Sequence, residues 1–178
     1  MKKLVLPVLI MLLASSCASI RVSSDYDKTA PFSVYKTYAY APEAMNLNIS
    51  ELNKRRLIDA LDKELQLKGF TLSDKPDVLI DLKFNAQAKQ SATTNTAMPY
   101  GGRYYGYRWR SSFATTTVSY ENYTEGTLFI EMIDAAKKQL VWQGRGIKTL
   151  DPDVSYKKRE SNINSAVKTI VELYPPKL

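Results

Sequence analysis

The chain has 178 residues, and its 25 lysines and arginines outnumber its 18 aspartates and glutamates to give a formal net charge of +7. This length suits one domain with a hydrophobic core of its own. The chain contains no histidine, which excludes Ser-His and Cys-His nucleophilic pairs and removes the usual zinc ligands. We therefore expect no enzyme activity, no metal site and no cofactor.

The first sixteen residues have the layout of a secretory signal peptide. Two lysines precede an apolar run from Leu4 to Leu13, and small residues follow up to Ser16. The apolar run is too short for a membrane-spanning helix, which needs about twenty residues. We therefore predict that residues 1–16 are a signal peptide.

Cys17 follows directly and is the only cysteine of the chain. Its place resembles the lipobox of bacterial lipoproteins, in which the thiol is acylated and the cysteine becomes the new N-terminus. We expect lipidation at Cys17, a tether over residues 17–19, and attachment to a membrane through the acyl chains. The alternative is ordinary secretion with a free thiol.

Removal of the signal peptide lowers the net charge to +5, because two lysines leave with it. A mild basic excess favours contact with anionic surfaces. An exported chain meets envelope proteins, glycan and anionic lipid, so we expect partners of these kinds and not nucleic acid.

Three elements are predicted in the first half of the chain. Ile20 and Val22 alternate with polar residues and indicate a first strand, and the aromatic segment 35–41 indicates a second. Ser50 can cap a helix that carries an apolar stripe, and Gly69 can close it.

The second half adds strands and a last helix. Apolar and polar residues alternate over 78–85, and 126–149 has the pattern of a β-hairpin. Segment 113–124 is rich in β-formers, and 163–174 places its apolar residues on one helical face. We predict an α+β fold, a mostly antiparallel sheet with two helices packed on one face, in a single domain over residues 20–178.

The polar segment 86–112 is predicted as a long connection, which is either functional or mobile. Its later part is a Gly/Tyr/Arg-rich insertion near 98–112. Aromatic faces stack on sugars, and arginines pair with phosphate or carboxylate, so this insertion is a candidate contact for a ligand or partner. The alternative is a hairpin tip with solvated side chains. The candidate contact residues are Arg103, Tyr104, Tyr105, Tyr107, Arg108, Trp109 and Arg110.

Two pairs of carboxylates are the remaining candidates for chemistry. Asp25 with Asp27, and Asp151 with Asp153, are each two residues apart, so on a strand each pair would share a face. Such pairs can bind a cation or hydrolyse a glycan. We favour the alternative, in which each aspartate bonds to the backbone of its own turn.

Seven short segments stand in a distinctive order along the chain. They are Asp25-Tyr26-Asp27, Tyr35-Lys36-Thr37-Tyr38-Ala39, Lys68-Gly69-Phe70, Pro76-Asp77-Val78-Leu79, Glu125-Gly126-Thr127-Leu128, Leu140-Val141-Trp142-Gln143-Gly144 and Tyr174-Pro175-Pro176. In this order they resemble the bacterial lipoprotein family of domain of unknown function 4136. The resemblance implies an envelope lipoprotein with no assigned activity, and it supplies no catalytic residue. Ala18 follows the cysteine where aspartate would signal inner-membrane retention, which implies the outer membrane. No acidic run that resembles a surface-export signal follows Cys17, so we expect the periplasmic side.

These features predict a membrane-anchored envelope lipoprotein that acts as a non-catalytic binding or assembly module. Two alternatives stay open. One is an envelope glycan hydrolase that uses the paired carboxylates. The other is a periplasmic carrier of lipid or of a small apolar ligand, which requires an apolar cavity between sheet and helices.

Overall fold

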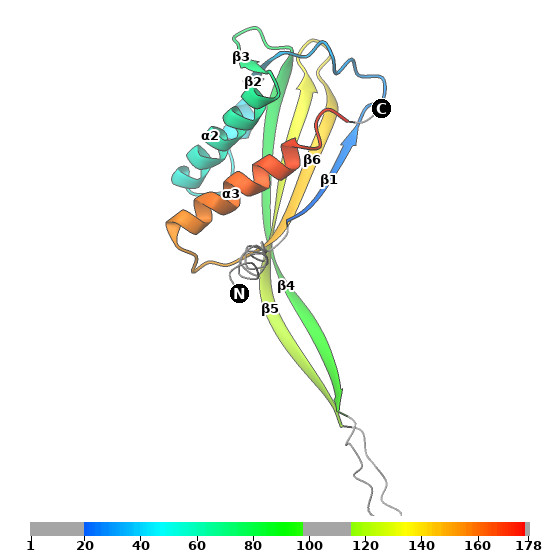
Figure 1. Cartoon of the computed structure of the whole chain (residues 1–178), viewed down its shortest axis with the longest axis vertical. Coiled ribbons are helices and arrows are strands. Elements are labelled where there is room, and N and C mark those ends of the chain that lie inside the picture. The colour runs from blue at the N-terminus through cyan, green and yellow to red at the C-terminus, as the bar shows by residue number, and fades with distance from the viewer. Residues whose placement is uncertain (1–19, 98–114, 177–178) are drawn as a thin grey trace, which may run out of the picture.

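The computed structural model describes residues 20–97 and 115–176, which form one sheet, two helices and the loops between them (Figure 1). The elements, in chain order, are β1 (Arg21–Tyr26), β2 (Thr37–Tyr40), the 3-10 helix η1 (Pro42–Met45), α2 (Glu51–Leu67), β3 (Thr71–Leu72), β4 (Val78–Ala97), β5 (Thr115–Asp134), β6 (Gln139–Leu150) and α3 (Tyr156–Val171).

The six strands lie in the order β1-β6-β5-β4-β2-β3, and α2 and α3 cover one face of this sheet (Figure 1). Strands β1, β6, β5 and β4 pair antiparallel, whereas β2 runs parallel to both β3 and β4. The predicted fold class is therefore confirmed, including the two helices on one face of a mostly antiparallel sheet.

The core lies between this sheet face and the two helices. Alternate residues of each strand point toward the helices, because successive side chains of a strand point to opposite faces. Each helix contributes the apolar stripe that its sequence spacing predicts. The largest fully buried side chains are Trp142, Tyr38, Leu61, Leu65, Ile80, Ile130, Met132, Ile170, Val78, Val167 and Val171.

The helix ends follow their capping residues. The Oγ atom of Ser50 accepts a hydrogen bond from the backbone N–H of Asn53 at 3.4 Å, and Gly69 has φ +87° directly after α2. Both features confirm the predicted helix. Helix α3 begins earlier than expected, after the cap Ser155, and ends at Val171. Among the described helices, none is long and apolar enough to cross a membrane.

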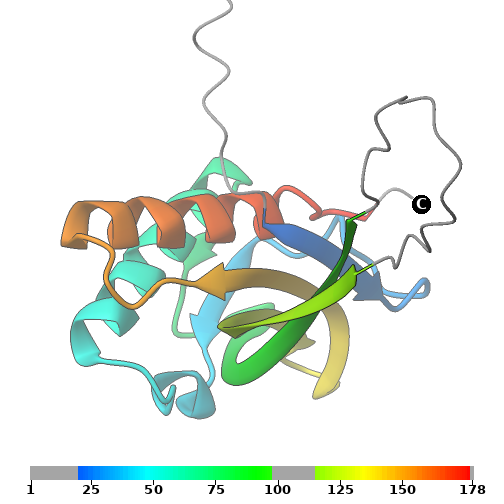
Figure 2. The ribbon, with the colours of Figure 1, turned by 90° about the horizontal axis from the view of Figure 1, so that it is seen from below.

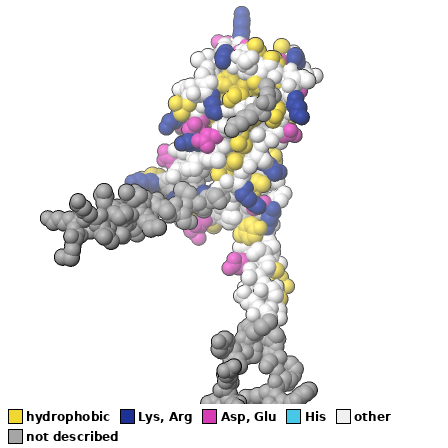
Figure 3. Space-filling view, turned by 45° about the vertical axis from the view of Figure 1, so that its right-hand side comes forward, with side chains coloured by type: hydrophobic (Ala, Val, Ile, Leu, Met, Phe, Trp, Pro, Cys, Tyr) yellow, Lys and Arg dark blue, Asp and Glu magenta, His cyan; other side chains and the backbone are white. Residues whose placement is uncertain are grey.

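Strands β4 and β5 continue far beyond the rest of the sheet and form a two-stranded arm (Figure 1). In Figure 2, seen from below, these two strands lie in front of the rest of the sheet. The arm comprises residues 89–97 and 115–123, which pair over nine residues, or about 30 Å. Strand β6 ends opposite Thr124, so neither strand of the arm pairs with a third described strand. Its surface is mostly neutral in Figure 3, in contrast with the charged domain.

The arm corrects one prediction. Segment 86–112 was expected to be a connection, but β4 runs on as a strand to Ala97. The polar residues of this segment show no apolar alternation, because both faces of the arm are exposed and backbone hydrogen bonds to β5 hold it. The strand expected over 113–124 is found from Thr115 on, and it is continuous with the strand of the predicted hairpin.

Candidate functional site: an apolar cavity between helices and sheet

A cavity of about 560 Å³ lies between the two layers, at the end of the sheet from which the arm leaves. We call it the interlayer cavity. Its walls come from the start of α2, from α3, from the loop between β6 and α3, and from β4, β5 and β6. The apolar residues that line it are Ile20, Ile49, Leu57, Phe84, Leu128, Leu150, Pro152, Val154, Ile163 and Ala166.

The cavity exists because small residues replace large ones at this end of the layer. On β5 the helix-facing positions run from Met132 and Ile130 to Leu128 and then to Gly126. Gly126 and Ala166 both line the cavity, one from the sheet and one from α3. The methyl group of Ala166 is too small to fill the space between the layers, and the side chain of Leu150 lies over Gly126.

Two cations line this mainly apolar space, whose wall also contains polar residues such as Ser50, Asn53 and Thr124. The Nζ atom of Lys148, on β6, donates to Oδ1 of Asn162 at 2.8 Å. The guanidinium of Arg159, on α3, donates to the backbone carbonyl of Pro152 at 3.2 Å. Each side chain is half-buried, and neither forms an ion pair with any residue of segments 20–97 and 115–176.

One acid, Asp151, is also part of the lining. Its Oδ1 atom accepts the backbone N–H of Asp153 at 2.9 Å, so this carboxylate is engaged in its own turn. The described lining therefore carries more positive than negative charge. A cavity with mainly apolar walls and a few charged groups can bind a hydrophobic ligand.

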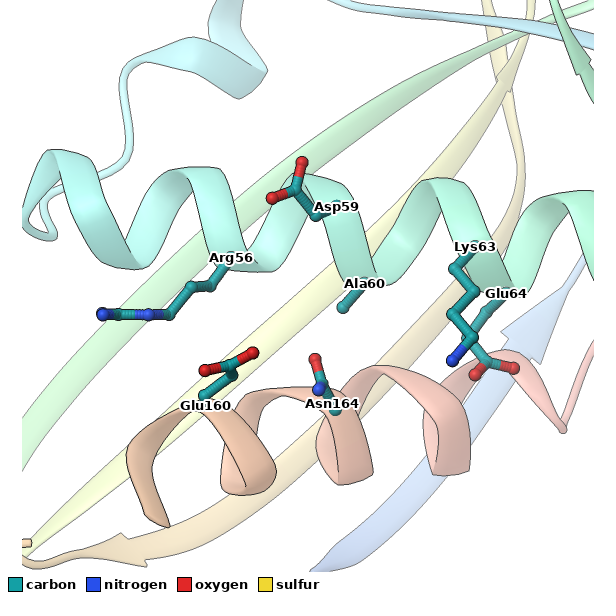
Figure 4. Close-up of a pocket in the computed structure, with 7 residues that line it drawn as sticks. All are labelled: Arg56, Asp59, Ala60, Lys63, Glu64, Glu160 and Asn164. Carbon is teal, nitrogen blue, oxygen red and sulfur yellow. The ribbon is translucent and has the colours of Figure 1, made fainter. Parts of the chain in front are cut away.

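A second, smaller pocket of about 210 Å³ lies on the outer surface between the two helices (Figure 4). In Figure 4 Glu160 and Asn164 point from α3 toward α2, whereas Asp59 points away from α3. Acids and bases are mixed in its wall, and Arg56 donates to Oδ1 of Asn53 at 2.9 Å. This arrangement is typical of a solvated seam between two helices.

Acidic groups on the open face of the sheet are paired with cations. Glu131 accepts from Nζ of Lys83 at 2.7 Å and from Nε2 of Gln143 at 2.7 Å. The hydrogen bond to Glu131 raises the pKa of Lys83. Glu125 accepts from Arg21 at 2.7 Å and from Lys89, and the bond from Lys89 is the largest cause that lowers the pKa of Glu125. These groups are mutually neutralised, which suits a structural role.

The two predicted carboxylate pairs do not form one cleft. Asp25 lies opposite Gln143, whereas Asp151 follows the far end of β6, about 20 Å or more away along the strand. All four aspartates are exposed. Asp27 accepts from the backbone N–H and from Oγ1 of Thr29, which lowers its pKa. The turn role favoured from the sequence is therefore found for Asp27, as it is for Asp151.

The other predicted site residues lie outside the described residues. Cys17 precedes the first described residue, Ile20. The seven candidate contacts of the insertion fall in the gap between Ala97 and Thr115; they are Arg103, Tyr104, Tyr105, Tyr107, Arg108, Trp109 and Arg110. These residues remain predictions.

The carrier alternative required an apolar cavity between sheet and helices, but sequence reasoning did not identify the residues that line it. Its lining comes from segments as far apart as Ile20 and Ala166, and no local pattern connects them. The available signal was the glycine at position 126 in an otherwise bulky strand, since glycine inside a strand often marks the close approach of another group.

Comparison with known proteins gives a family and similar structures. The family model described as Domain of unknown function (DUF4136) matches residues 22–176. No curated protein matches the chain. A PDZ domain protein from Parabacteroides distasonis is 18% identical with a TM-score of 0.49, and the match covers 90% of this chain but 37% of that chain. Two structures of the PelC dodecamer from Paraburkholderia phytofirmans are 10% and 8% identical with TM-scores of 0.49, and these matches cover 86% of this chain and 95% of theirs.

Proposed function

We propose that this chain, which belongs to the DUF4136 family, is a membrane-anchored envelope lipoprotein that binds an apolar ligand in the interlayer cavity. The observation that carries the proposal is the cavity itself, about 560 Å³ with mainly apolar walls. Cavities that hold small molecules typically measure about 300–1,000 Å³ and combine apolar walls with a few polar groups. The carrier alternative required such a space between sheet and helices.

The cavity opens to solvent, because Leu150 and Pro152 in its wall are exposed. Apolar surface that remains in contact with water is unfavourable, and a ligand that covers it is stabilised. The rest of the core has eleven fully buried large side chains, so the chain has the residues needed for dense packing. A ligand in the cavity would make contacts with the apolar wall, including Ala166 on α3.

The anchor is the second part of the proposal. Acylation of Cys17 would tie the chain to a membrane three residues before Ile20, which lines the cavity. Ala18 after the cysteine favours the outer membrane, and the lack of an acidic run after Cys17 favours its periplasmic side. Ligand binding would then take place beside the lipid surface.

The binding test uses an environment-sensitive fluorescent fatty-acid probe with the full-length chain. Ala166→Phe fills the cavity from α3, and we expect it to weaken probe binding by about tenfold or more. Ser165→Phe places the same ring on the exposed side of the same helix and serves as the control. If Ala166→Phe folds and binds the probe as tightly as Ser165→Phe, the cavity is not the ligand site.

The arm supports a second function, that of assembly with an envelope partner. It extends two strands by nine residue pairs beyond the domain, and the described part of it presents uncovered strand edges. Uncovered edges can pair with another chain. Cross-linking in the intact envelope, followed by mass spectrometry, should give a partner that disappears when residues 98–112 are deleted. Unchanged cross-links would show that residues 98–112 take no part in partner recognition.

A further inference from the structure

We infer that the ligand of the interlayer cavity is an amphiphile that places an acyl chain in the cavity and has an anionic head, a carboxylate or a phosphate, held by Lys148 and Arg159. This inference rests on the proposed function and names the class of ligand. It combines the apolar chamber with the two cations in its wall.

The first argument is that neither cation has a counter-charge among residues 20–97 and 115–176. Elsewhere on the sheet, cations next to buried acids are paired, as Lys83 is with Glu131. Lys148 and Arg159 are also half-buried, yet each donates only to a neutral oxygen among the described residues. A partly buried charge is stabilised by an opposite charge, and here a ligand can supply it.

The second argument is the electrostatics of α3. Its first turn contains no acid and carries Lys157, Lys158 and Arg159. The N-terminal end of a helix is itself positive and is normally stabilised by acidic residues, as α2 is by Glu51. Of these three cations Arg159 lines the cavity, so the positive end of α3 adds to the potential of Lys148 there. An anion bound in the cavity would be stabilised by Lys148, by Arg159 and by the helix end.

The third argument is that the cations come from both layers. Lys148 belongs to the sheet and Arg159 to α3, and the Lys148–Asn162 hydrogen bond ties the two elements together beside the cavity. Asp151 is the acid in the lining, and its carboxylate already accepts the N–H of Asp153. An anionic head can thus be held between β6 and α3 while its chain contacts the apolar walls.

The source of the amphiphile is either the adjacent membrane or free fatty acid. Ile20 lines the cavity, and three residues of extended chain reach at most about 10 Å back to Cys17. An anchored chain would therefore hold the cavity beside the headgroups of its own leaflet. Phospholipid and fatty acid share the required chemistry, an acyl chain with an acidic head.

The test uses full-length chain reconstituted in phosphatidylcholine vesicles and photoreactive diazirine probes, with labelled peptides located by mass spectrometry. The probes are palmitic acid and the uncharged alcohol of equal chain length. We expect the acid to label cavity-lining peptides about tenfold more than the alcohol. In the double variant Lys148→Gln, Arg159→Gln, labelling by the acid should fall to the level of labelling by the alcohol. Lys75→Gln with Lys168→Gln, exposed sites elsewhere with the same loss of charge, should leave labelling unchanged.

Each result has a distinct meaning. Equal labelling of the cavity by acid and alcohol overturns the anionic head and leaves the proposed function standing. Labelling by neither probe overturns both. A parallel comparison of diazirine phosphatidylglycerol with diazirine phosphatidylcholine identifies the source: preferential labelling by the anionic phospholipid assigns the membrane, and labelling by palmitic acid alone assigns free fatty acid. Thermal unfolding of each variant confirms that the compared chains are folded.

Discussion

At the residue scale, Gly144 shows how closely α3 approaches the sheet. A Cβ atom at this position would lie 2.4 Å from Cγ2 of Ile170 and 2.5 Å from Cη2 of Trp142. Both neighbours are fully buried and have no free space to move into. We predict that Gly144→Ala lowers the free energy of unfolding by about 1–3 kcal/mol, as overpacked core positions do. Urea unfolding measures it.

Gly126→Ala is the matched control for that substitution. Its Cβ atom would also meet a side chain, at 2.8 Å from Leu150, but Leu150 lies at the surface and can turn away. We expect a loss of less than about 0.5 kcal/mol, within the range of ordinary surface changes. Equal losses for the two variants would contradict the close approach of α3 at Gly144.

Asp134 gives a prediction about pH. Its carboxylate accepts from the backbone N–H groups of Lys137 and Ala136, at 2.8 Å and 2.9 Å, and from Oη of Tyr35 at 2.9 Å. The bond from Lys137 is the largest cause that holds the pKa of Asp134 below its ordinary value of 3.8. The unfolded chain therefore takes up this proton first, and the stabilisation is complete above pH 3.8 and is lost as pH falls through the folded pKa.

The measurement compares wild type with Asp134→Asn by urea unfolding between pH 7 and pH 2. We expect the stability difference between the two chains to be constant at neutral pH and to shrink below about pH 4. Asp74→Asn, at an exposed turn, is the control and should show no such change. A difference that stays constant to pH 2 would refute the role of the charged carboxylate.

Some residue roles could be predicted from the sequence and others could not. Ser50 and Gly69 act within one turn of the helix that they bound, so local spacing is sufficient to predict them. Lys148 and Arg159 belong to one cavity only because β6 and α3 pack together. Their pairing is a property of the tertiary structure.

At the scale of the element, the arm is predicted to be dispensable for folding. No residue of the hydrophobic core lies in residues 89–97 or 115–123. A chain in which an Asn-Gly turn replaces residues 91–121 keeps Gln90 opposite Asn122 and closes a two-residue hairpin. We expect its free energy of unfolding to change by less than about 1 kcal/mol. A chain that fails to fold would show that the arm stabilises the domain.

The arm was missed because hydrophobic alternation is the signal for a half-buried strand. Strand β4 has that signal up to Phe84, where one of its faces covers the core. Beyond Ala88 both faces are exposed, and β-sheet hydrogen bonds satisfy a polar sequence as well as an apolar one. The same element therefore has two sequence patterns, of which the first alone predicts a strand.

At the scale of the whole molecule, the anchor and the domain should be separable. Among the described residues the buried core runs from Ala30 to Tyr174, with Val22 and Tyr26 packed against it, so loss of lipid at Cys17 should not unfold it. We predict that a clickable fatty acid labels the wild type in cells and not Cys17→Ser, and that the variant leaves the membrane fraction. Equal labelling of both chains would exclude Cys17 as the acylated residue.

The separation of arm and core also affects how such chains can diverge. Substitutions in the arm leave the core contacts intact, whereas substitutions around Gly144 or in the cavity wall change the packing of two layers at once. Mutations that change the length or chemistry of the arm can therefore be selected without lowering the stability of the domain. Related chains should differ most over 89–123 and keep the small residues Gly126 and Ala166, so that one fold serves different partners while holding one kind of ligand.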